Sequence, residues 1–371
     1  MFRFADALGP EKIVHIYEPA LGLKAIVVVD NTAAGPAIGG TRMAPDVSVE
    51  ECFRLARAMT LKNAAAGLAH GGAKSVITGD PAMAPGAKEQ IVRAFAVAIR
   101  DLTAYIPGPD MGTDETAMAW VKDEIGRSVG LPREVGGIPL DEIGATGLGL
   151  AVAAEAAQEL GGPRLAGARV AVQGFGAVGQ HAARFLAEKG AVLVAASDSR
   201  GAIADSNGLD IAALMALKRD GGHLGSYGHA KALDREAIVA VPCDIWIPAA
   251  RPDELRADNV GQLETRLVLQ GANIPATLEA EKILHERGIL SIPDFIANAG
   301  GVICASVEYH GGSEAAAMAA IAEKISRNTT EVLKAVRAEG TLPRTAAVAL
   351  AERRVRKAMA LGRWHGGVAK A

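Results

Sequence analysis

A glycine-rich turn between a strand-like and a helix-like segment constrains the fold of this chain more than any other feature. Residues 174–179 (GFGAVG) follow the β-prone run 169–173 and open a segment typical of a helix, which continues to about Lys189. Glycines at these positions allow a tight turn, close approach of a pyrophosphate to the backbone, and close packing of helix on strand. The helix N-terminus then faces the phosphate groups. The turn therefore predicts a dinucleotide-binding site.

Strand-like and helix-like segments alternate through the second half of the chain. We expect helices at 147–160 and 315–337 and a basic helix from Arg344, with further strands at 192–197, 243–248 and 267–270. Alternation of this kind is typical of an α/β fold with a parallel, doubly wound sheet of the Rossmann type.

Asp198 ends the strand that comes after the glycine-rich turn, nineteen residues beyond Gly179. A carboxylate at that place can accept hydrogen bonds from ribose hydroxyls, which favours NAD as the cofactor. Its neighbours Ser197, Ser199 and Arg200 could instead accommodate the 2′-phosphate of NADP. The sequence therefore favours NAD without excluding NADP.

The first half of the chain predicts a second α/β unit. Residues 23–30 and 75–78 are strand-like, and Ser48 can cap a helix that carries acidic residues in its first turn. Residues 88–100 have the apolar spacing of an amphipathic helix. The Pro- and Gly-rich run 106–112 is expected to be a loop.

Length and composition exclude several classes of protein. A chain of 371 residues is long enough for two domains, and 39 basic against 42 acidic residues leave no electrostatic signature of nucleic-acid or membrane binding. Cys52, Cys243 and Cys304 show neither disulfide nor metal-ligand spacing, so we expect no metal. Without a signal-peptide pattern or a membrane-length apolar run, a cytoplasmic protein is expected.

Two lysines twelve residues apart, Lys62 and Lys74, lie in an Ala- and Gly-rich stretch that looks buried or cleft-lining. An ammonium group there is costly unless a carboxylate or a reaction needs it, and a desolvated lysine can act as a general base. The alternative is two surface lysines, one at a helix end and one in the following loop.

Polar residues in three loops are candidates for ligand contacts. Asp110 lies among small and rigid residues, a common setting for a positioned carboxylate, although a lone loop aspartate more often forms a turn. Asn273 follows a strand of the nucleotide-binding sheet, where such sheets bind ligands. Asn298, before Gly300 and Gly301, could equally begin a helix.

In their order along nearly the whole chain, these segments resemble the glutamate/leucine/phenylalanine/valine dehydrogenase family. The resemblance is carried by several independent motifs: Gly35-Pro36-Ala37-Ile38-Gly39-Gly40, Lys62, Gly71-Gly72-Ala73-Lys74, Asp110, Ala145-Thr146-Gly147, Gln173-Gly174-Phe175-Gly176, Gly271-Ala272-Asn273 and Asn298-Ala299-Gly300-Gly301. It implies reversible oxidative deamination of an L-amino acid to its 2-oxo acid and ammonia with NAD. It also implies a homo-oligomer whose active cleft lies between a substrate domain and a dinucleotide domain.

The resemblance assigns roles to residues. Lys74 would be the catalytic lysine that activates water, Asp110 would exchange protons with the amine, and Lys62 would bind the α-carboxylate. Substrate contacts would also come from Gly39, Gly40 and Asn273. The cofactor contacts would be Thr146, Gly174, Phe175, Gly176, Ala177, Val178, Gly179, Asp198, Ala249, Asn273 and Asn298.

Three positions bear on the choice of substrate. Glutamate dehydrogenases look to carry the motif GPAKGG, with a lysine where this chain has Ile38, and a serine where it has Ala305. In those enzymes the lysine and the serine would pair with the γ-carboxylate of glutamate. Both positions are apolar here. Leucine dehydrogenases look to carry alanine and valine where this chain has Gly108 and Ala305, which would widen the pocket. We therefore expect a bulky apolar substrate: leucine, valine or phenylalanine.

Other functions stay open as alternatives: a glutamate dehydrogenase, a non-catalytic NAD-binding regulator, and an amine dehydrogenase that needs no carboxylate. The expected domains are residues 1–135 for substrate binding and oligomerisation and residues 136–328 for NAD binding. C-terminal helices at 329–371 are expected to pack back towards the first domain.

Overall fold

The computed structural model describes residues 2–362, which form two compact units. Among the described residues, unit 1 comprises 2–139, 302–317 and 348–362, and unit 2 comprises 140–301 and 318–347. This division differs from the expected one, because residues 302–317 group with the first unit and residues 329–347 with the second. The last part of the expected C-terminal segment, residues 363–371, lies outside the described residues.

A five-stranded mixed sheet forms the framework of unit 1. Its order is β1-β2-β4-β3-β5, with β1 and β2 antiparallel and β4, β3 and β5 parallel to one another. The strands are β1 (Lys12–Glu18), β2 (Leu23–Asn31), β3 (Ala37–Ala44), β4 (Gly72–Thr78) and β5 (Tyr105–Pro109).

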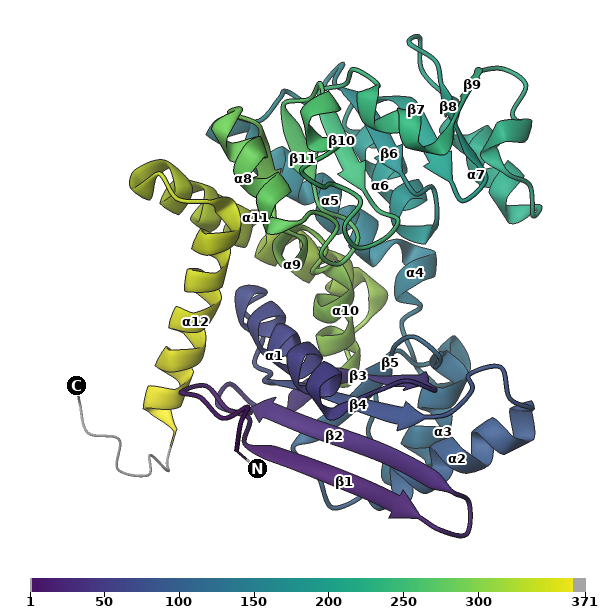
Figure 1. Ribbon diagram of the computed structural model, residues 1–371, viewed down its shortest axis with the longest axis vertical. Helices are drawn as coiled ribbons and strands as arrows, with labels where there is room; N and C mark the ends of the chain where they lie inside the picture. Colours follow the sequence, from purple (N-terminus) through teal and green to yellow (C-terminus); the bar gives the residue numbers. More distant parts are fainter. Residues whose placement is uncertain (1, 363–371) are drawn as a thin grey trace. The chain divides into compact units, whose positions relative to one another are not determined.

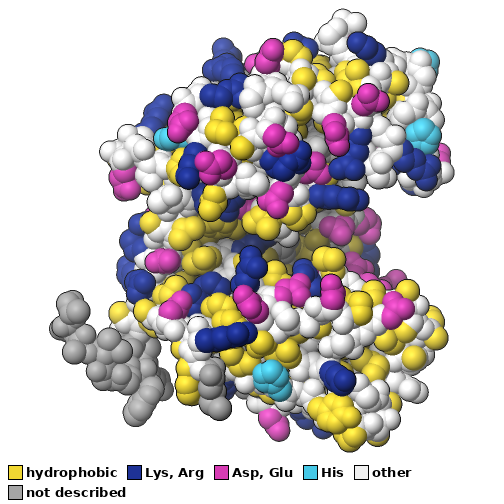
Figure 2. Space-filling view, in the orientation of Figure 1, with side chains coloured by type: hydrophobic (Ala, Val, Ile, Leu, Met, Phe, Trp, Pro, Cys, Tyr) yellow, Lys and Arg dark blue, Asp and Glu magenta, His cyan; other side chains and the backbone are white. Residues whose placement is uncertain are grey.

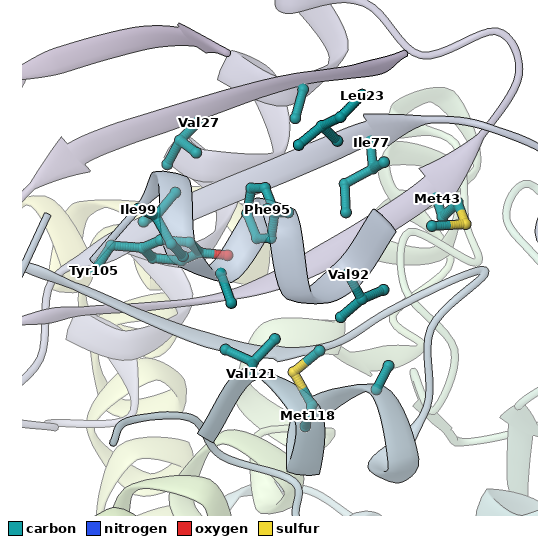
Figure 3. Packing of buried hydrophobic residues seen from close by; sticks show 14 of the residues in the cluster. Leu23, Val27, Met43, Ile77, Val92, Phe95, Ile99, Tyr105, Met118 and Val121 are labelled. Atoms are coloured by element: carbon teal, nitrogen blue, oxygen red, sulfur yellow. The ribbon is translucent and has the colours of Figure 1, made fainter. Parts of the chain in front are cut away.

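Helices cover both faces of this sheet (Figure 1). On one face lies α1 (Val49–Ala65), capped by the Ser48 side chain as expected, with Cys52 and Ala56 packed against strand residues. On the other face, α2 (Pro85–Ala98) and α3 (Glu115–Ile125) enclose the larger apolar core. Figure 3 shows that core, with Phe95 of α2 among Val27, Ile77, Tyr105, Met118 and Val121.

The expected loop at 106–112 is wrong for its first half, because Tyr105–Pro109 forms the strand β5. Proline cannot donate to a strand ladder and is therefore tolerated at the edge of a sheet. β5 is the edge strand next to β3, so Pro107 and Pro109 do not interrupt the sheet. The strand ends immediately before Asp110 and thereby fixes the position of that residue.

Unit 2 contains the expected doubly wound sheet, in the order β12-β11-β10-β6-β7-β8-β9. Five strands are parallel, and β8 and β9 add two antiparallel strands at one edge. The strands are β6 (Arg169–Gln173), β7 (Val192–Asp198), β8 (Gly201–Ala204), β9 (Lys231–Leu233), β10 (Ile245–Pro248), β11 (Leu267–Leu269) and β12 (Leu290–Ile292). The chain order reverses between β6 and β10, and parallel sheets bind ligands at such a switch point.

The remaining helices fall mostly in the second half of the chain. They are α4 (Leu140–Ile143), α5 (Ala145–Ala157), α6 (Ala177–Glu188), α7 (Ile211–Arg219), α8 (Leu278–Glu286), α9 (Asp294–Ala297), α10 (Gly300–Tyr309), α11 (Glu314–Glu339) and α12 (Pro343–Leu361). Short 3₁₀ helices occur at Arg133–Val135, Gln158–Leu160, Leu224–Ser226, Arg235–Ala240 and Val260–Gln262. No helix within residues 2–362 is long and apolar enough to cross a membrane.

Charged side chains of both signs are interspersed on the face shown in Figure 2. This mixing agrees with the net charge of −3.

Candidate functional site

The structure brings Lys74 and Asp110 together in unit 1. The Lys74 Nζ lies 2.6 Å from the Asp110 Oδ2, and the lysine side chain is only 6% exposed. Lys74 projects from the middle of β4, whereas Asp110 directly follows β5. Lys74 is therefore a buried strand lysine with a carboxylate partner, which excludes the surface-loop alternative for this residue.

A third charged residue, missed in the sequence, completes this group. The Arg42 Nε lies 3.0 Å from the same Asp110 oxygen, and its Nη1 pairs with Glu51 on α1. Arg42 lies on β3 two residues after Gly40, and arginine is too common at surfaces for the sequence to have singled it out.

The environment of the pair shifts both pKa values. Burial lowers the pKa of Lys74 below its usual 10.5, although the charge of Asp110 opposes this. Burial alone would raise the pKa of Asp110, but the charges of Lys74 and Arg42 outweigh it and leave that pKa below its usual value. The arrangement thus favours an ionised Asp110 next to a lysine that loses its proton more easily than a surface lysine.

Two glycines of β3 make room for the pair. A Cβ on Gly40 would lie 2.9 Å from the Asp110 Cβ and 3.0 Å from the Lys74 Nζ. A Cβ on Gly39 would overlap the carbonyl oxygen of Ala73, so glycine is required for β3 to approach β4. Behind them, the buried Tyr105 hydroxyl lies within hydrogen-bond distance of the Gly39 carbonyl and the side chains of Thr41 and Ser75, 2.8–3.2 Å away.

Lys62 lies in the last turn of α1, half-buried, on the helix that covers the Lys74 face of the sheet. The helix is anchored there by Asn63, whose side-chain amide donates to the carbonyls of Ile38 and Gly71. The role of Lys62 in binding the substrate α-carboxylate stays a prediction.

An apolar cluster in unit 1 contains two of the three expected specificity residues. Ile38 and Ala305 pack together with Ile106 and Val129, and all four are buried. The sequence missed Ile106 and Val129, because neither belongs to a motif.

The size argument built on Gly108 is corrected by this cluster. A Cβ on Gly108 would lie 3.1 Å from the Cγ2 of Val129. Val129 therefore occupies the space that the missing side chain was expected to leave. The cluster is apolar, as expected, but Gly108 does not widen it.

Glu308 links α10, which carries Ala305, to the loop that carries Val129. One carboxylate oxygen accepts from the backbone N–H groups of Gly130 and Leu131, at 2.7 and 3.3 Å, and the other accepts from Ile138 at 2.7 Å. Burial raises the pKa of Glu308, while these N–H donors oppose the rise. These bonds hold the α10 segment that carries Ala305 against the loop that carries Val129, which explains why residues 302–317 group with unit 1.

The glycine-rich turn in unit 2 has the geometry of a dinucleotide cradle. Gly174 has φ +96°, and a Cβ there would lie 2.8 Å from Ala249 and Ala250, which follow β10. A Cβ on Gly179 would overlap the Gly174 carbonyl oxygen, whereas Gly176 at the N-terminus of α6 faces open space. The turn thus packs tightly behind and stays open in front, which fits a bound pyrophosphate.

The other expected residues of this turn take different positions. Phe175 is buried in the unit, and the first residues of α6, Ala177 and Val178, are exposed and half-buried. Thr146 lies in the first turn of α5, where its hydroxyl approaches Gly301. Asn298 donates from its side-chain amide to Asn273 Oδ1 at 3.1 Å and to two carbonyls of the same loop, so these two asparagines are in contact; their role in cofactor binding stays a prediction.

Asp198 ends β7, but its carboxylate is already engaged. One oxygen accepts from the Arg200 N–H, and the other from Lys218 Nζ at 2.8 Å and the Leu224 N–H at 2.9 Å. Burial alone would raise the pKa of Asp198, but these hydrogen bonds outweigh it and lower the pKa. The sequence missed Lys218, which lies on α7 and carries no motif.

The three cysteines form no disulfide within residues 2–362. Cys52, Cys243 and Cys304 are buried free thiols, and burial raises their pKa values, to about 12 for Cys52 and Cys304 and about 11 for Cys243. No group of three or more His, Cys, Asp or Glu residues in that range could hold a metal ion.

Comparison with protein families gives two matches that together span most of the chain. Residues 136–362 match "Glutamate/Leucine/Phenylalanine/Valine dehydrogenase", and residues 10–127 match "Glu/Leu/Phe/Val dehydrogenase, dimerisation domain". The expected resemblance is therefore confirmed.

Curated relatives carry the name of one branch of that family. The chain is 38% identical over 359 residues to a glutamate dehydrogenase of Aeropyrum pernix, covering 90% of this chain and 85% of the relative. It is 40% identical over 302 residues to an NADP(+)-dependent glutamate dehydrogenase of Pyrobaculum calidifontis, covering 76% and 71%. These names favour glutamate, the alternative prediction, over leucine, valine or phenylalanine.

Solved structures share the fold and carry more than one substrate name. A hetero-hexameric glutamate dehydrogenase of Thermus thermophilus in a leucine-bound form matches with a TM-score of 0.84 and 30% identity, covering 96% of this chain and 91% of that one. L-Tryptophan dehydrogenase of Nostoc punctiforme matches with a TM-score of 0.76 and 26% identity, covering 95% and 97%.

Proposed function

This chain belongs to the glutamate/leucine/phenylalanine/valine dehydrogenase family, and we propose that it catalyses the reversible oxidative deamination of an L-amino acid. Membership makes it an oxidoreductase that acts on CH–NH₂ groups with a nicotinamide dinucleotide. The observation that carries the proposal is the buried Lys74–Asp110 pair, 2.6 Å apart beneath the bare backbone of Gly40.

The residues of unit 1 supply the acid–base chemistry in this proposal. A bound oxidised dinucleotide would supply the acceptor for the hydride of the substrate Cα. Lys74, as a neutral amine, takes a proton from the water that attacks the resulting imine carbon. Asp110 receives and returns the protons of the substrate nitrogen, which leaves as ammonia. Lys62 binds the α-carboxylate and orients the Cα.

Two lines of support point to different substrates. The apolar cluster of Ile38, Ile106, Val129 and Ala305 favours an apolar side chain, because a γ-carboxylate buried among these four residues would lack a partner, at a cost of several kcal/mol. The names of the relatives favour glutamate. On the geometry, we propose a leucine-, valine- or phenylalanine-type substrate as the first candidate and glutamate as the second.

For the cofactor we propose NAD as the preferred form, because Asp198 closes β7 where ribose hydroxyls bind. Lys218 limits this preference, since it neutralises the carboxylate that would otherwise repel a 2′-phosphate. The NADP(+)-dependent relative also supports use of NADP as a second cofactor.

For assembly we propose a homo-oligomer. The support for an oligomer is that residues 10–127 match a dimerisation domain and that one structural relative is a hetero-hexamer. The proposed active chemistry uses residues of a single chain.

A substrate panel tests the proposed function. Reduction of NAD and of NADP is followed with leucine, valine, phenylalanine, tryptophan, glutamate and simple amines, with the Lys74→Met variant as the blank. Turnover of leucine or phenylalanine well above glutamate supports the apolar candidate, and the reverse order supports the glutamate candidate. Dinucleotide binding without turnover of any amino acid would indicate the non-catalytic regulator, and turnover of amines alone an amine dehydrogenase.

A further inference from the structure

Arg42 contacts the proposed catalytic pair but has no part in the chemistry assigned so far. Its Nε and the Lys74 Nζ approach the same oxygen of Asp110, at 3.0 and 2.6 Å. The side chains of Arg42 and Asp110 are 17% and 22% exposed, so water screens their charges only in part.

Charge balance around Asp110 explains what the arginine does. When Lys74 is protonated, one carboxylate faces two cations, and one of these must share an oxygen that the other already occupies. An arginine stays protonated in proteins, so only the lysine can relieve the crowding of two cations on one Asp110 oxygen by losing its proton. The neutral amine then lies next to the Arg42–Asp110 ion pair, and Glu51 pairs with Arg42 from α1.

We propose that Arg42 is a positioning residue that holds Asp110 as a carboxylate and makes the neutral amine of Lys74 accessible for catalysis. The inference rests on the proposed function for its catalytic meaning, but the protonation state of Lys74 can be measured without any turnover. Burial is the main cause that lowers the pKa of Lys74, and the charge of Arg42 lowers it further, which agrees with this role.

Other ionisable groups around Lys74 do not replace this role. Glu51 pairs with Arg42 from α1, and Cys52 of the same helix donates its thiol to the Lys74 carbonyl at 3.3 Å. Burial keeps the thiol of Cys52 and the hydroxyl of Tyr105 neutral by raising their pKa values. Lys62, on the same helix, remains in every variant below.

A purely structural reading of Arg42 is the rival explanation, because the Arg42–Glu51 pair also links β3 to α1. Arg57 provides a matched control for that reading. It lies on α1 and forms the same kind of helix-to-strand ion pair, with Asp30 of β2 at 2.8 Å and with Asp6 at 2.6 Å. Its partners do not include Lys74 or Asp110.

The test measures the pKa of Lys74 directly, from the rate at which an amine-reactive acylating reagent labels it across pH. Peptide mass mapping reads the labelling in wild type, Arg42→Met and Arg57→Met, all as full-length chains. We expect Arg42→Met to raise the pKa of Lys74 by about one unit. Arg57→Met should lower thermal stability and leave the pKa unchanged. Equal Lys74 pKa values in wild type and Arg42→Met would overturn the proposal.

Two further variants keep the test decisive if Arg42→Met does not fold. Arg42→Lys retains the charge and is expected to keep the Lys74 pKa near the wild-type value. Glu51→Gln removes the link to α1 but leaves both cations on Asp110, so it should not raise the Lys74 pKa. A higher Lys74 pKa in Glu51→Gln would show that the pKa depends on the Arg42–Glu51 pair between β3 and α1, and would overturn the proposal.

Activity gives the second readout and separates this inference from the proposed function. If wild type oxidises an amino acid, the rising limb of its kcat/KM profile should move about one pH unit upward in Arg42→Met. If wild type oxidises none, the proposed function fails, and the labelling experiment still decides the role of Arg42.

Discussion

Val129 fills the space beside Gly108: a Cβ on the glycine would lie 3.1 Å from the valine Cγ2. Gly108 comes from β5 and Val129 from the loop after α3, and the Val129 N–H donates to the carbonyl of Pro107, the residue before Gly108, at 2.9 Å. The volume of the apolar cluster therefore depends on a residue outside the sequence motifs. A pocket estimate from the motif residues alone is too large at this point.

Val129→Ala should shift substrate preference towards larger apolar side chains. Removing two methyl groups leaves space next to Ile38 and Ala305 and costs about 2 kcal/mol of stability. The ratio of kcat/KM for phenylalanine to that for valine should rise. Val121→Ala in the α3 core is the control, which should lose similar stability without changing the ratio. An unchanged ratio in Val129→Ala would remove this cluster from the specificity site.

The pH dependence of the reaction should follow the protonation of Lys74. The proposed base is the neutral amine, and its pKa lies below 10.5 because the side chain is buried. kcat/KM for deamination should therefore rise with pH through that pKa and fall away on the acid side. Lys74→Met should lower kcat by about 10²–10⁴-fold while the dinucleotide still binds. A variant with near-normal kcat would exclude Lys74 as the base.

Lys218→Met should separate the two dinucleotides. Without this cation, Asp198 repels a 2′-phosphate more strongly, and a potential phosphate partner is lost. Affinity for NADPH should fall about tenfold, an effect of about 1.4 kcal/mol, whereas affinity for NADH should change little. Calorimetry with 2′,5′-ADP and AMP measures the difference without catalysis. The control is Lys189→Met, which breaks the ion pair between Lys189 and Glu155 and should change the affinity for neither ligand.

Glu308→Gln should destabilise the fold despite the similar size of the two side chains. Both carboxylate oxygens accept backbone N–H groups, and the amide of a glutamine would place its own N–H₂ against one of these donors. Leaving a buried donor unpaired costs about 1–3 kcal/mol. Thermal unfolding should show this loss, whereas Glu286→Gln, at an exposed position of α8, should leave the melting temperature unchanged. Equal melting temperatures of Glu308→Gln and wild type would argue against these hydrogen bonds.

Sequence patterns were informative where local chemistry decides the structure. The strand, turn and helix around Gly174 form as expected, because φ +96° and the contact with Ala250 both require glycine there. The meeting of Lys74 and Asp110 could be anticipated only through the family motifs, since their spacing of 36 residues carries no geometric information.

Features set by tertiary contacts were missed for physical reasons. β5 contains two prolines that predict a loop, and only its place at the sheet edge permits a strand. Arg42 and Lys218 look like ordinary surface residues until the fold pairs each with a buried carboxylate. The grouping of residues 302–317 with unit 1 depends on hydrogen bonds between Glu308 and a loop about 170 residues earlier in the chain.

Side chains of β3 alternate between the two faces of the sheet, and this separates the residues near the proposed site from those of the core. Even-numbered residues of the strand line the α1 face, where Ile38 packs in the apolar cluster, Gly40 makes room for the Lys74 amine, and Arg42 holds Asp110. The odd-numbered residues, such as Ala37 and Met43, pack in the opposite core. One strand thus carries selectivity and reactivity at separate positions, so mutation at position 38 could recruit a new metabolite while the reaction itself is inherited unchanged.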